Sequence, residues 1–377
     1  MTSAGGSPAV GNDRTEEAAL EELLLEIATT PAPTGSEAAR GDVVAHHWRD
    51  AGLQTSEDDV GNVVASMPGS GAGADSGPTV MIAGHLDSVF GLDVDVSVDR
   101  SDRTRWVGAG LGDNAASLAL LTRWVADPGS GPWPNLTLVA TVGEEGLGDL
   151  RGARHVVETL GGQQDIFIAL DGYLGSVIDV GVGSRRYEAT FKAPGGHSWG
   201  DYPSPSATHA AGDAMARLAA LRVPKVPRSS LNIGQIWGGT SINAIAERAG
   251  FNLDMRSVDE DALAALERSA LAAIEQAAEG QGAQVELERV GDRPAGACSS
   301  PRLLEAAKSA FLAVGLTPST NAGSTDANAA MAAGIPALCF GVYRGGNAHR
   351  LDEWVDPTSL ATGVLALREL LGRLTKL

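Results

Sequence analysis

The feature that most constrains the fold is a repeated alternation of short apolar runs with longer segments of helical periodicity. The runs are residues 79–84 (TVMIAG), 136–142 (LTLVATV) and 166–171 (IFIALD), and the helical segments between them are residues 114–125 and 150–160. Nearly continuous apolar runs of this length are typical of strands that are covered on both faces of a parallel sheet. The pattern therefore predicts an α/β fold with a mostly parallel sheet.

The pattern changes near residue 183 and returns near residue 301. Between these points the expected strands alternate apolar and polar residues, and two alanine-rich helices lie among them: strands 185–192, 230–237, 250–255 and 284–290, and helices 207–221 and 260–278. This composition predicts a small antiparallel α+β layer. We therefore expect one α/β domain, residues 1–182 and 297–377, interrupted by a smaller α+β domain, residues 183–296.

Composition excludes several classes of protein. The net charge of −19, with 28 basic and 47 acidic residues, argues against a nucleic-acid partner, because phosphate binding needs clustered Lys and Arg. No apolar run approaches the ~18 residues of a membrane span, and the first residues lack the pattern of a signal peptide. Two cysteines, Cys298 and Cys339, form no disulfide framework and are expected to be small buried hydrophobic residues rather than nucleophiles. We expect a cytoplasmic protein without a membrane partner.

Ionisable residues gather at the ends of the expected strands. In an open parallel sheet the carboxyl ends of the strands meet at one rim, where ligands bind. The residues expected at this rim are His85, Asp87, Asp113, Glu144, Glu145, Asp171 and His349. None of them is a Lys or an Arg, so the sequence predicts a rim with a large excess of carboxylates.

Carboxylates packed together repel one another and need a compensating charge. Histidines and carboxylates without a thiolate suit zinc, cobalt or manganese, and the number of carboxylates suits a site for two metal ions. Asp87 lies two residues after His85 on an extended strand, so both side chains point to the same face and Asp87 can orient the imidazole.

Several motifs occur together and in a characteristic order. They are GHLDSVF, GAGLGDNAASLALL, VGEEG, IALDG, PGGHS and NAHRLDEW, with PAPTGSE early and GSTDAN late in the chain. In this order they resemble the M20 family of dinuclear metallopeptidases and amidohydrolases, in particular its peptidase T-like or dipeptidase-like members. The resemblance covers almost the whole chain.

The resemblance implies roles for the rim residues. One metal ion would be held by His85 and Asp171, the other by Glu145 and His349, with Asp113 bridging both. Glu144 would be the general base that takes a proton from a metal-bridged water, and Asp87 would act with it as a catalytic residue. The resemblance implies two divalent metal ions per chain, with zinc expected and cobalt or manganese as alternatives.

For residues 183–296 the resemblance implies a lid that also forms a homodimer. His197 would stabilise the oxyanion that forms during hydrolysis, in the active site of its own or of the partner chain. Asn243 and Arg256 would hold the substrate, with Ser324 of the GSTDAN loop as a further contact. Arg256 alternatively forms only an ion pair within the lid.

The expected activity is hydrolysis of amide bonds in short peptides, by an exopeptidase of the di- or tripeptidase or aminopeptidase type. A carboxypeptidase or an N-acyl amino acid amidohydrolase is the alternative. The third carboxylate is Asp171 rather than Glu, which favours the peptidases, but residues 114–116 lack a Lys that many relatives have. Two further alternatives are a binding protein that lost its chemistry and a nucleotide-binding protein that uses the glycine loop 108–112.

Overall fold

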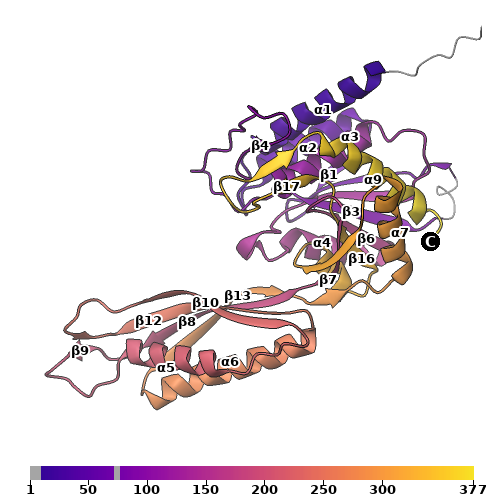
Figure 1. The fold of residues 1–377 in the computed structure, drawn as a ribbon. Helices are drawn as coiled ribbons and strands as arrows, with labels where there is room; N and C mark the ends of the chain where they lie inside the picture. Colours follow the sequence, from indigo (N-terminus) through magenta and orange to yellow (C-terminus); the bar gives the residue numbers. More distant parts are fainter. Residues whose placement is uncertain (1–9, 72–76) are drawn as a thin grey trace, which may run out of the picture. The chain divides into compact units, whose positions relative to one another are not determined.

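The computed structural model describes residues 10–71 and 77–377. The chain forms two compact units, one built from residues up to Asp179 together with Ala297–Leu377, and one built from Val180–Gly296 (Figure 1). Each unit has its own hydrophobic core. The two units are described separately below.

The first unit contains a nine-stranded sheet in the order β1-β2-β5-β3-β6-β16-β7-β14, with β15 paired to β7. Its strands are β1 (Thr55–Glu57), β2 (Val63–Met67), β3 (Thr79–His85), β5 (Asn135–Thr141), β6 (Ile166–Leu170), β7 (Ser176–Gly181), β14 (Gly296–Ala297), β15 (Ser319–Gly323) and β16 (Ala337–Phe340). The four central strands β5, β3, β6 and β16 are parallel, whereas β2 and β7 pair with them antiparallel. The predicted parallel sheet is thus confirmed as the centre of a larger mixed sheet.

Helices cover both faces of this sheet, and β3 shows it directly. Val80 and Ile82 belong to one hydrophobic cluster, whereas Met81 and Ala83 belong to another. Successive strand residues point to opposite faces, so both faces of β3 are buried. The helices of this unit are α1 (Val10–Ala28), α2 (Ala38–Asp50), α3 (Ser117–Ala126), α4 (Arg151–Leu160), α7 (Pro301–Ala313), α8 (Ala327–Ala332) and α9 (Ser359–Leu374).

A small three-stranded sheet in this unit carries loops of the candidate site. Its order is β17-β18-β4, with β4 (Trp106–Val107), β17 (Arg344–Gly346) and β18 (Trp354–Asp356). Trp354 pairs with Val107. The pairing joins two segments that lie almost 250 residues apart in the chain.

The second unit is a four-stranded antiparallel sheet in the order β10-β12-β8-β13. Its strands are β8 (Gly183–Lys192), β10 (Ser229–Gly238), β12 (Arg248–Ser257) and β13 (Gln284–Arg293), and a short pair is formed by β9 (Gly196–His197) and β11 (Ala244–Ile245). Helices α5 (Ala207–Ala220) and α6 (Glu260–Gly280) pack on this sheet (Figure 1). The unit has the α+β composition that the sequence predicts.

In the described residues, no helix combines the length and the apolar composition that a bilayer crossing requires.

Candidate active site

The candidate site lies at the rim where three neighbouring parallel strands end. His85 is the last residue of β3, Glu144 and Glu145 follow β5, and Asp171 follows β6. Because β5, β3 and β6 are adjacent in the sheet, these residues lie side by side.

Two further residues reach the rim from loops. Asp113 comes from the segment Leu111–Ala116 before α3, and His349 comes from the loop between β17 and β18. Asp113 has non-helical backbone angles (φ −97°, ψ 96°) inside that segment. His349 has a φ of +66°, a left-handed conformation that is costly for a residue with a side chain. The Asn347 side chain holds this loop through a 3.0 Å hydrogen bond to the Asp352 carboxylate.

Asp113 lies between two histidines. Its Oδ1 is 3.0 Å from Nε2 of His85, and its Oδ2 is 3.1 Å from Nε2 of His349. His349 Nε2 is also 2.9 Å from Oε1 of Glu145. One carboxylate therefore joins the two halves of the rim.

The possible ligand atoms form two groups that share Asp113. One group contains His85, Asp113 and Asp171, and the other contains Asp113, Glu145 and His349. Within each group the ligand atoms lie within 4.8 Å of one another. A third group of the same size joins Glu144 to His85 and Glu145. The fold thus brings together all five residues predicted as ligands, along with Glu144.

The rim contains more carboxylates than its two histidines can neutralise. Burial, the negative charge of Asp113 and that of Glu145 raise the pKa of Asp171 to about 7. Hydrogen bonds to Asp113 and Glu145 raise the pKa of His349 to about 10. Although burial opposes a charge on His85, its hydrogen bonds to carboxylates raise its pKa well above the ordinary value.

This donor set fits divalent metal ions. Imidazole nitrogens and carboxylate oxygens at short mutual distances are ligands that zinc, cobalt and manganese accept. A bound cation would also offset the repulsion that raises the pKa of Asp171.

Asp87 contacts His85 less directly than its sequence position predicts. Nδ1 of His85 lies 3.0 Å from the backbone oxygen of Asp87 and 3.6 Å from the carboxylate. The carboxylate instead accepts the backbone N–H groups of Glu144 and Glu145, both at 2.9 Å, and the hydroxyl of Thr34 at 2.8 Å. Burial opposes the charge, but these hydrogen bonds and His85 lower the pKa of Asp87 to about 2. Asp87 therefore holds the loop that carries both glutamates.

Three residues around the rim were not found from the sequence. Thr34 contacts Asp87, and buried Asp326 accepts a 2.5 Å hydrogen bond from Thr141 and acts electrostatically on Asp171. Glu353 is also buried and accepts backbone N–H groups of the loop before α3. Thr34, Asp326 and Glu353 lie in PAPTGSE, GSTDAN and NAHRLDEW, so the motifs marked the segments without indicating the residues.

The glycine loop 108–112 does not present free N–H groups to a phosphate. The N–H groups of Gly110 and Gly112 donate to the Glu353 carboxylate at 2.9 and 3.0 Å. Because Glu353 already accepts both N–H groups, they are not available to a phosphate. The geometry argues against the nucleotide-binding alternative.

The cysteines are not placed as metal ligands. Cys339 is buried, and its Sγ donates to the backbone oxygen of Asp171 at 3.1 Å. Burial and the negative charge of Asp171 raise the pKa of its thiol well above the usual value. Cys298 is only partly buried, which corrects the expectation that both are buried.

His197 and Asn243 lie beside each other in the second unit. His197 on β9 pairs with Ala244 on β11, and the N–H of Ser198 donates to the backbone oxygen of Asn243 at 3.0 Å. Nδ1 of the exposed His197 accepts the N–H groups of Trp199 and Gly200, both at 3.2 Å. These bonds place the ring proton on Nε2, so His197 presents an N–H donor to solvent.

The structure separates Arg256 from this pair. Arg256 pairs with Ser184 near one end of the β8–β12 ladder, whereas β9 and β11 follow its other end, where Arg248 pairs with Lys192. Eight residues of strand at ~3.3 Å each separate the two ends by about 26 Å. The Arg256 guanidinium forms an ion pair with Asp254 at 2.8 Å, the alternative that the sequence left open.

Ser324 is partly buried between β15 and α8 in the first unit. Its role as a substrate contact stays a prediction.

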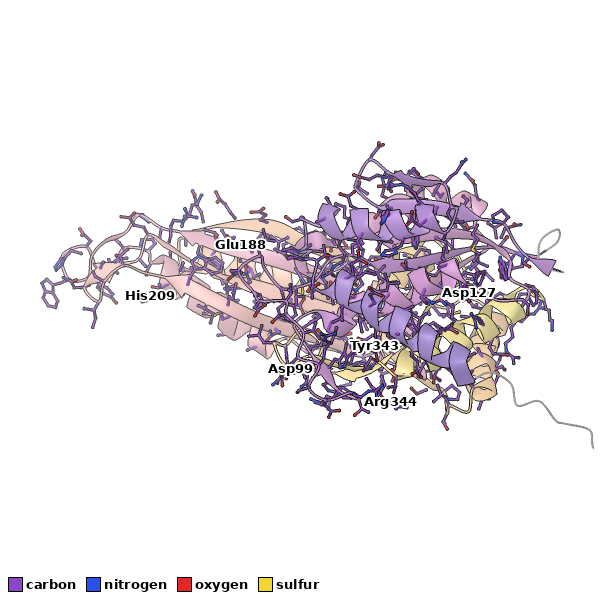
Figure 2. All side chains as sticks on the ribbon, turned by 90° about the horizontal axis from the view of Figure 1, so that it is seen from above. Asp99, Asp127, Glu188, His209, Tyr343 and Arg344 are labelled. Atoms are coloured by element: carbon purple, nitrogen blue, oxygen red, sulfur yellow. The ribbon has the colours of Figure 1, made fainter. Side chains whose placement is uncertain are left out.

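The remaining histidines have ordinary partners or lie on the surface. His46 lies 3.5 Å from Asp50, and His155 lies 3.7 Å from Asp58. His209 is exposed on α5 (Figure 2). The same view labels Tyr343, which is buried in the first unit.

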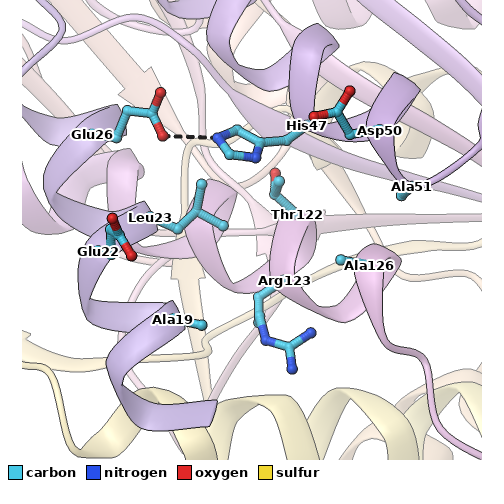
Figure 3. A pocket seen from close by; sticks show the side chains of 10 residues that line it. All are labelled: Ala19, Glu22, Leu23, Glu26, His47, Asp50, Ala51, Thr122, Arg123 and Ala126. Atoms are coloured by element: carbon cyan, nitrogen blue, oxygen red, sulfur yellow. Dashed lines mark hydrogen bonds and ion pairs between the residues drawn. The ribbon is translucent and has the colours of Figure 1, made fainter. Parts of the chain in front are cut away.

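A cavity of about 540 Å³ lies among α1, α2 and α3 (Figure 3). His47 lines it and forms a 2.8 Å hydrogen bond with Glu26. None of the predicted site residues is among the described residues that line this cavity.

Residues 81–373 match the family model described as peptidase family M20/M25/M40. The chain belongs to this family of metal-dependent hydrolases. A putative succinyl-diaminopimelate desuccinylase, DapE, from Mycobacterium tuberculosis is 28% identical over 306 residues, which cover 78% of this chain and 82% of the relative.

Two solved structures share the fold over nearly the whole chain. Aminopeptidase PepT from Bacillus cereus is 24% identical with a TM-score of 0.79, covering 95% of this chain and 98% of that one. A tripeptidase from Staphylococcus aureus is 22% identical with a TM-score of 0.82, covering 96% and 99%.

Proposed function

We propose that the protein is a dinuclear metal-dependent exopeptidase that hydrolyses short peptides, with zinc as the metal. The observation that carries the proposal is the position of Asp113 within hydrogen-bonding distance of His85 on one side and His349 on the other. This arrangement is what two metal ions sharing one carboxylate require. The aminopeptidase and tripeptidase folds support the choice of peptides as substrates.

Five residues would hold the metal ions. His85 and Asp171 would hold one, Glu145 and His349 the other, and Asp113 would bridge both. When bound, the ions polarise the substrate carbonyl and lower the pKa of the attacking water. The ends of β3, β5 and β6 position His85, Glu145 and Asp171, and two loops position Asp113 and His349.

Glu144 is the proposed general base. Asp87 accepts the Glu144 N–H at 2.9 Å and thereby fixes the backbone of this residue. The neighbouring Glu145 N–H is held by the same carboxylate, also at 2.9 Å. Glu144 can take a proton from water and pass it to the leaving amine while Glu145 remains a ligand.

His197 and Asn243 are proposed to bind the substrate carbonyl. The Nε2–H of His197 is a hydrogen-bond donor of the kind that stabilises a developing oxyanion. Asn243 offers an amide beside it, since Asn243 directly precedes β11, whose Ala244 pairs with His197. Arg256 would bind the substrate carboxylate, because its planar fork suits that group.

The separation within the second unit bears on which chain supplies His197. Arg256 lies about 26 Å from the end of the β8–β12 ladder that leads into β9 and His197, whereas an extended tripeptide spans at most ~11 Å. If both residues contact one short substrate, they must come from two copies of the chain. We therefore propose that His197 acts in the active site of a partner chain.

The edge strand β10 supports the proposed homodimer. β10 lies at the edge of its sheet, and residues 235–238 at its end are exposed. Near this end Ile236 is 64% exposed, Trp199 89% and Ile242 fully exposed. An edge strand with exposed apolar residues is a surface on which a second chain can pair. The cytoplasmic location stays a prediction.

An N-acyl amino acid amidohydrolase or carboxypeptidase is the second candidate. The relative named as a putative desuccinylase is 28% identical and favours hydrolysis of an N-acyl group. The same metal ligands and general base would serve this reaction. The two candidates differ only in which end of the substrate is recognised.

A comparison of blocked substrates tests the proposal. The zinc-loaded protein is assayed on one tripeptide, on its N-acetylated form and on its C-terminal amide. An aminopeptidase should not cleave the N-acetylated form, whereas a carboxypeptidase should not cleave the C-terminal amide. Cleavage of the acetyl group itself would favour the amidohydrolase, and no cleavage of any short acyl or peptidyl amide would contradict both candidates.

A further inference from the structure

One buried carboxylate, Glu353, contacts the loop that carries Asp113. Glu353 is 1% exposed and lies four residues after His349. Its Oε2 accepts the Gly110 N–H at 2.9 Å. Its Oε1 accepts the N–H groups of Gly112 at 3.0 Å and of Asp113 itself at 2.8 Å. Three hydrogen bonds thus fix the loop up to the residue whose side chain lies between the histidines.

The backbone reinforces this link. The N–H of Gly108 donates to the backbone oxygen of Glu353 at 2.9 Å, and Trp354 pairs with Val107. The loop of Asp113 and the segment that carries His349 are therefore held together at Glu353. A shift of the carboxylate would move the Asp113 backbone relative to both histidines.

The contact leaves little room. A Cβ added at Gly112 would lie 2.6 Å from Oε1 of Glu353 and 2.8 Å from the Tyr343 ring. The carboxylate packs directly on the loop backbone. A side chain that is shorter, or that places a donor there, cannot reproduce the contact.

We propose that Glu353 is a positioning residue that fixes Asp113 in the place from which it bridges the two metal ions, an inference that rests on the proposed function. Glutamine has the same length but offers one acceptor oxygen. Its NH₂ group would face at least one of the three N–H donors. Glu353→Gln should therefore weaken metal binding without removing a ligand.

Asp356 provides a matched control in the same segment. It is also a buried carboxylate, and it accepts the N–H and hydroxyl of Thr358, at 3.1 and 2.7 Å, near the start of α9. It also pairs with Arg344. Among the described contacts of Asp356, none is to Gly110, Gly112 or Asp113. Asp356→Asn therefore disturbs a local cap and leaves the Asp113 loop unchanged.

The test is a Co²⁺ titration of the metal-free full-length chain, followed by visible absorption, for the wild type, E353Q and D356N. We expect E353Q to bind Co²⁺ about 10-fold to 100-fold more weakly than the wild type and to show an altered absorption band. D356N should bind within about twofold of the wild type, since the metal ligands are unaffected. With excess metal, E353Q should lower kcat and leave KM nearly unchanged.

E353Q that binds Co²⁺ as tightly as the wild type, with the same spectrum, would overturn the inference. If metal-free E353Q loses its far-UV circular dichroism, E353D replaces it, because E353D keeps the charge but is one methylene shorter. E353D should also bind Co²⁺ more weakly, and wild-type affinity there would equally overturn the inference. A wild-type chain that does not bind Co²⁺ at all would contradict the proposed function instead.

Discussion

The two units each contain a cluster of carboxylates, and the clusters differ in how their charge is balanced. In the second unit the charged cluster consists of Arg185, Arg289, Glu260, Glu267 and Asp292. Asp292 lies 2.7 Å from Arg185 and 2.8 Å from Arg289. Its carboxylates face guanidinium groups, so two positive charges of the chain itself offset most of the negative charge of three carboxylates.

The rim of the first unit pairs its carboxylates with histidines instead. Asp113 and Glu145 contact His85 and His349, whereas the pKa of Asp171 is raised by burial and then by the neighbouring acids, Asp113 first. The charged cluster of the second unit is held by its own ion pairs, whereas the rim would be neutralised by the two proposed metal ions. The partners of a buried carboxylate therefore indicate its role better than its burial does.

The largest expected effect is a loss of catalytic rate when an acid of the rim is changed, compared with no loss when an acid of the charged cluster is changed. Glu144→Gln should lower kcat by about 10² to 10⁴, because the variant cannot accept a proton, and it should retain its bound metal. Glu267→Gln in the charged cluster is the control and should retain the wild-type rate. The measurements are the initial rate on the best substrate of the blocked-peptide series and the metal content by elemental analysis. A Glu144→Gln variant with more than about a tenth of the wild-type rate would rule out the general-base role.

Sequence reasoning reached the rim because strand ends are easy to recognise. Apolar runs predict β3, β5 and β6, and the residue after each run then falls at the same edge. The outer strands β1 and β7 were missed, since their residues are partly polar and gain their order from pairing with neighbouring strands.

The supporting contacts of the site could not be predicted in the same way. Glu353 acts on N–H groups about 240 residues earlier in the chain, and no local pattern encodes that contact. Asp87 was expected to orient His85, but its carboxylate mainly holds the loop of Glu144. Such contacts depend on tertiary packing, which only the structure gives.

The next effect concerns the proposed role of His197 in the second unit. His197→Ala should lower kcat by about 10² to 10³, since an oxyanion donor is lost. His209→Ala is the matched control, because His209 is an exposed histidine of the same unit. Rates at saturating substrate provide the measurement.

Mixing two inactive variants tests the partner-chain assignment. After co-refolding, Glu144→Gln and His197→Ala should recover about a quarter of the wild-type rate, since random pairing in a symmetric dimer leaves about one site in four with both residues. No recovery, with mixed dimers demonstrated by mass spectrometry, would place His197 in the active site of its own chain.

A smaller effect is expected on stability when the charged cluster is broken. Glu267→Gln removes the negative charge that faces Arg185 and Arg289 and replaces one acceptor oxygen by an NH₂ group, and Glu267 is only 12% exposed. The free energy of unfolding should fall by about 1 to 3 kcal/mol. Urea unfolding with and without zinc measures it, and the loss should be the same in both conditions. A loss that disappears when zinc is added would mean that the cluster is coupled to the rim.

The smallest effect has the opposite sign and concerns the rim without metal. Asp171→Asn removes a carboxylate whose pKa is raised to about 7, first by burial and then by Asp113. Because the folded pKa lies above the unfolded value, ionised Asp171 destabilises the metal-free fold as the pH rises from about 4 to about 7. At pH 8 with a chelator, the variant should therefore be as stable as the wild type or more stable by about 1 kcal/mol, with a smaller difference at pH 5. Added zinc should raise the melting temperature of the wild type more than that of the variant, since the variant lacks a ligand. If metal-free Asp171→Asn instead lost stability at pH 8, as Glu267→Gln should, the rim carboxylates would be stabilising groups, and the contrast between the clusters would fail.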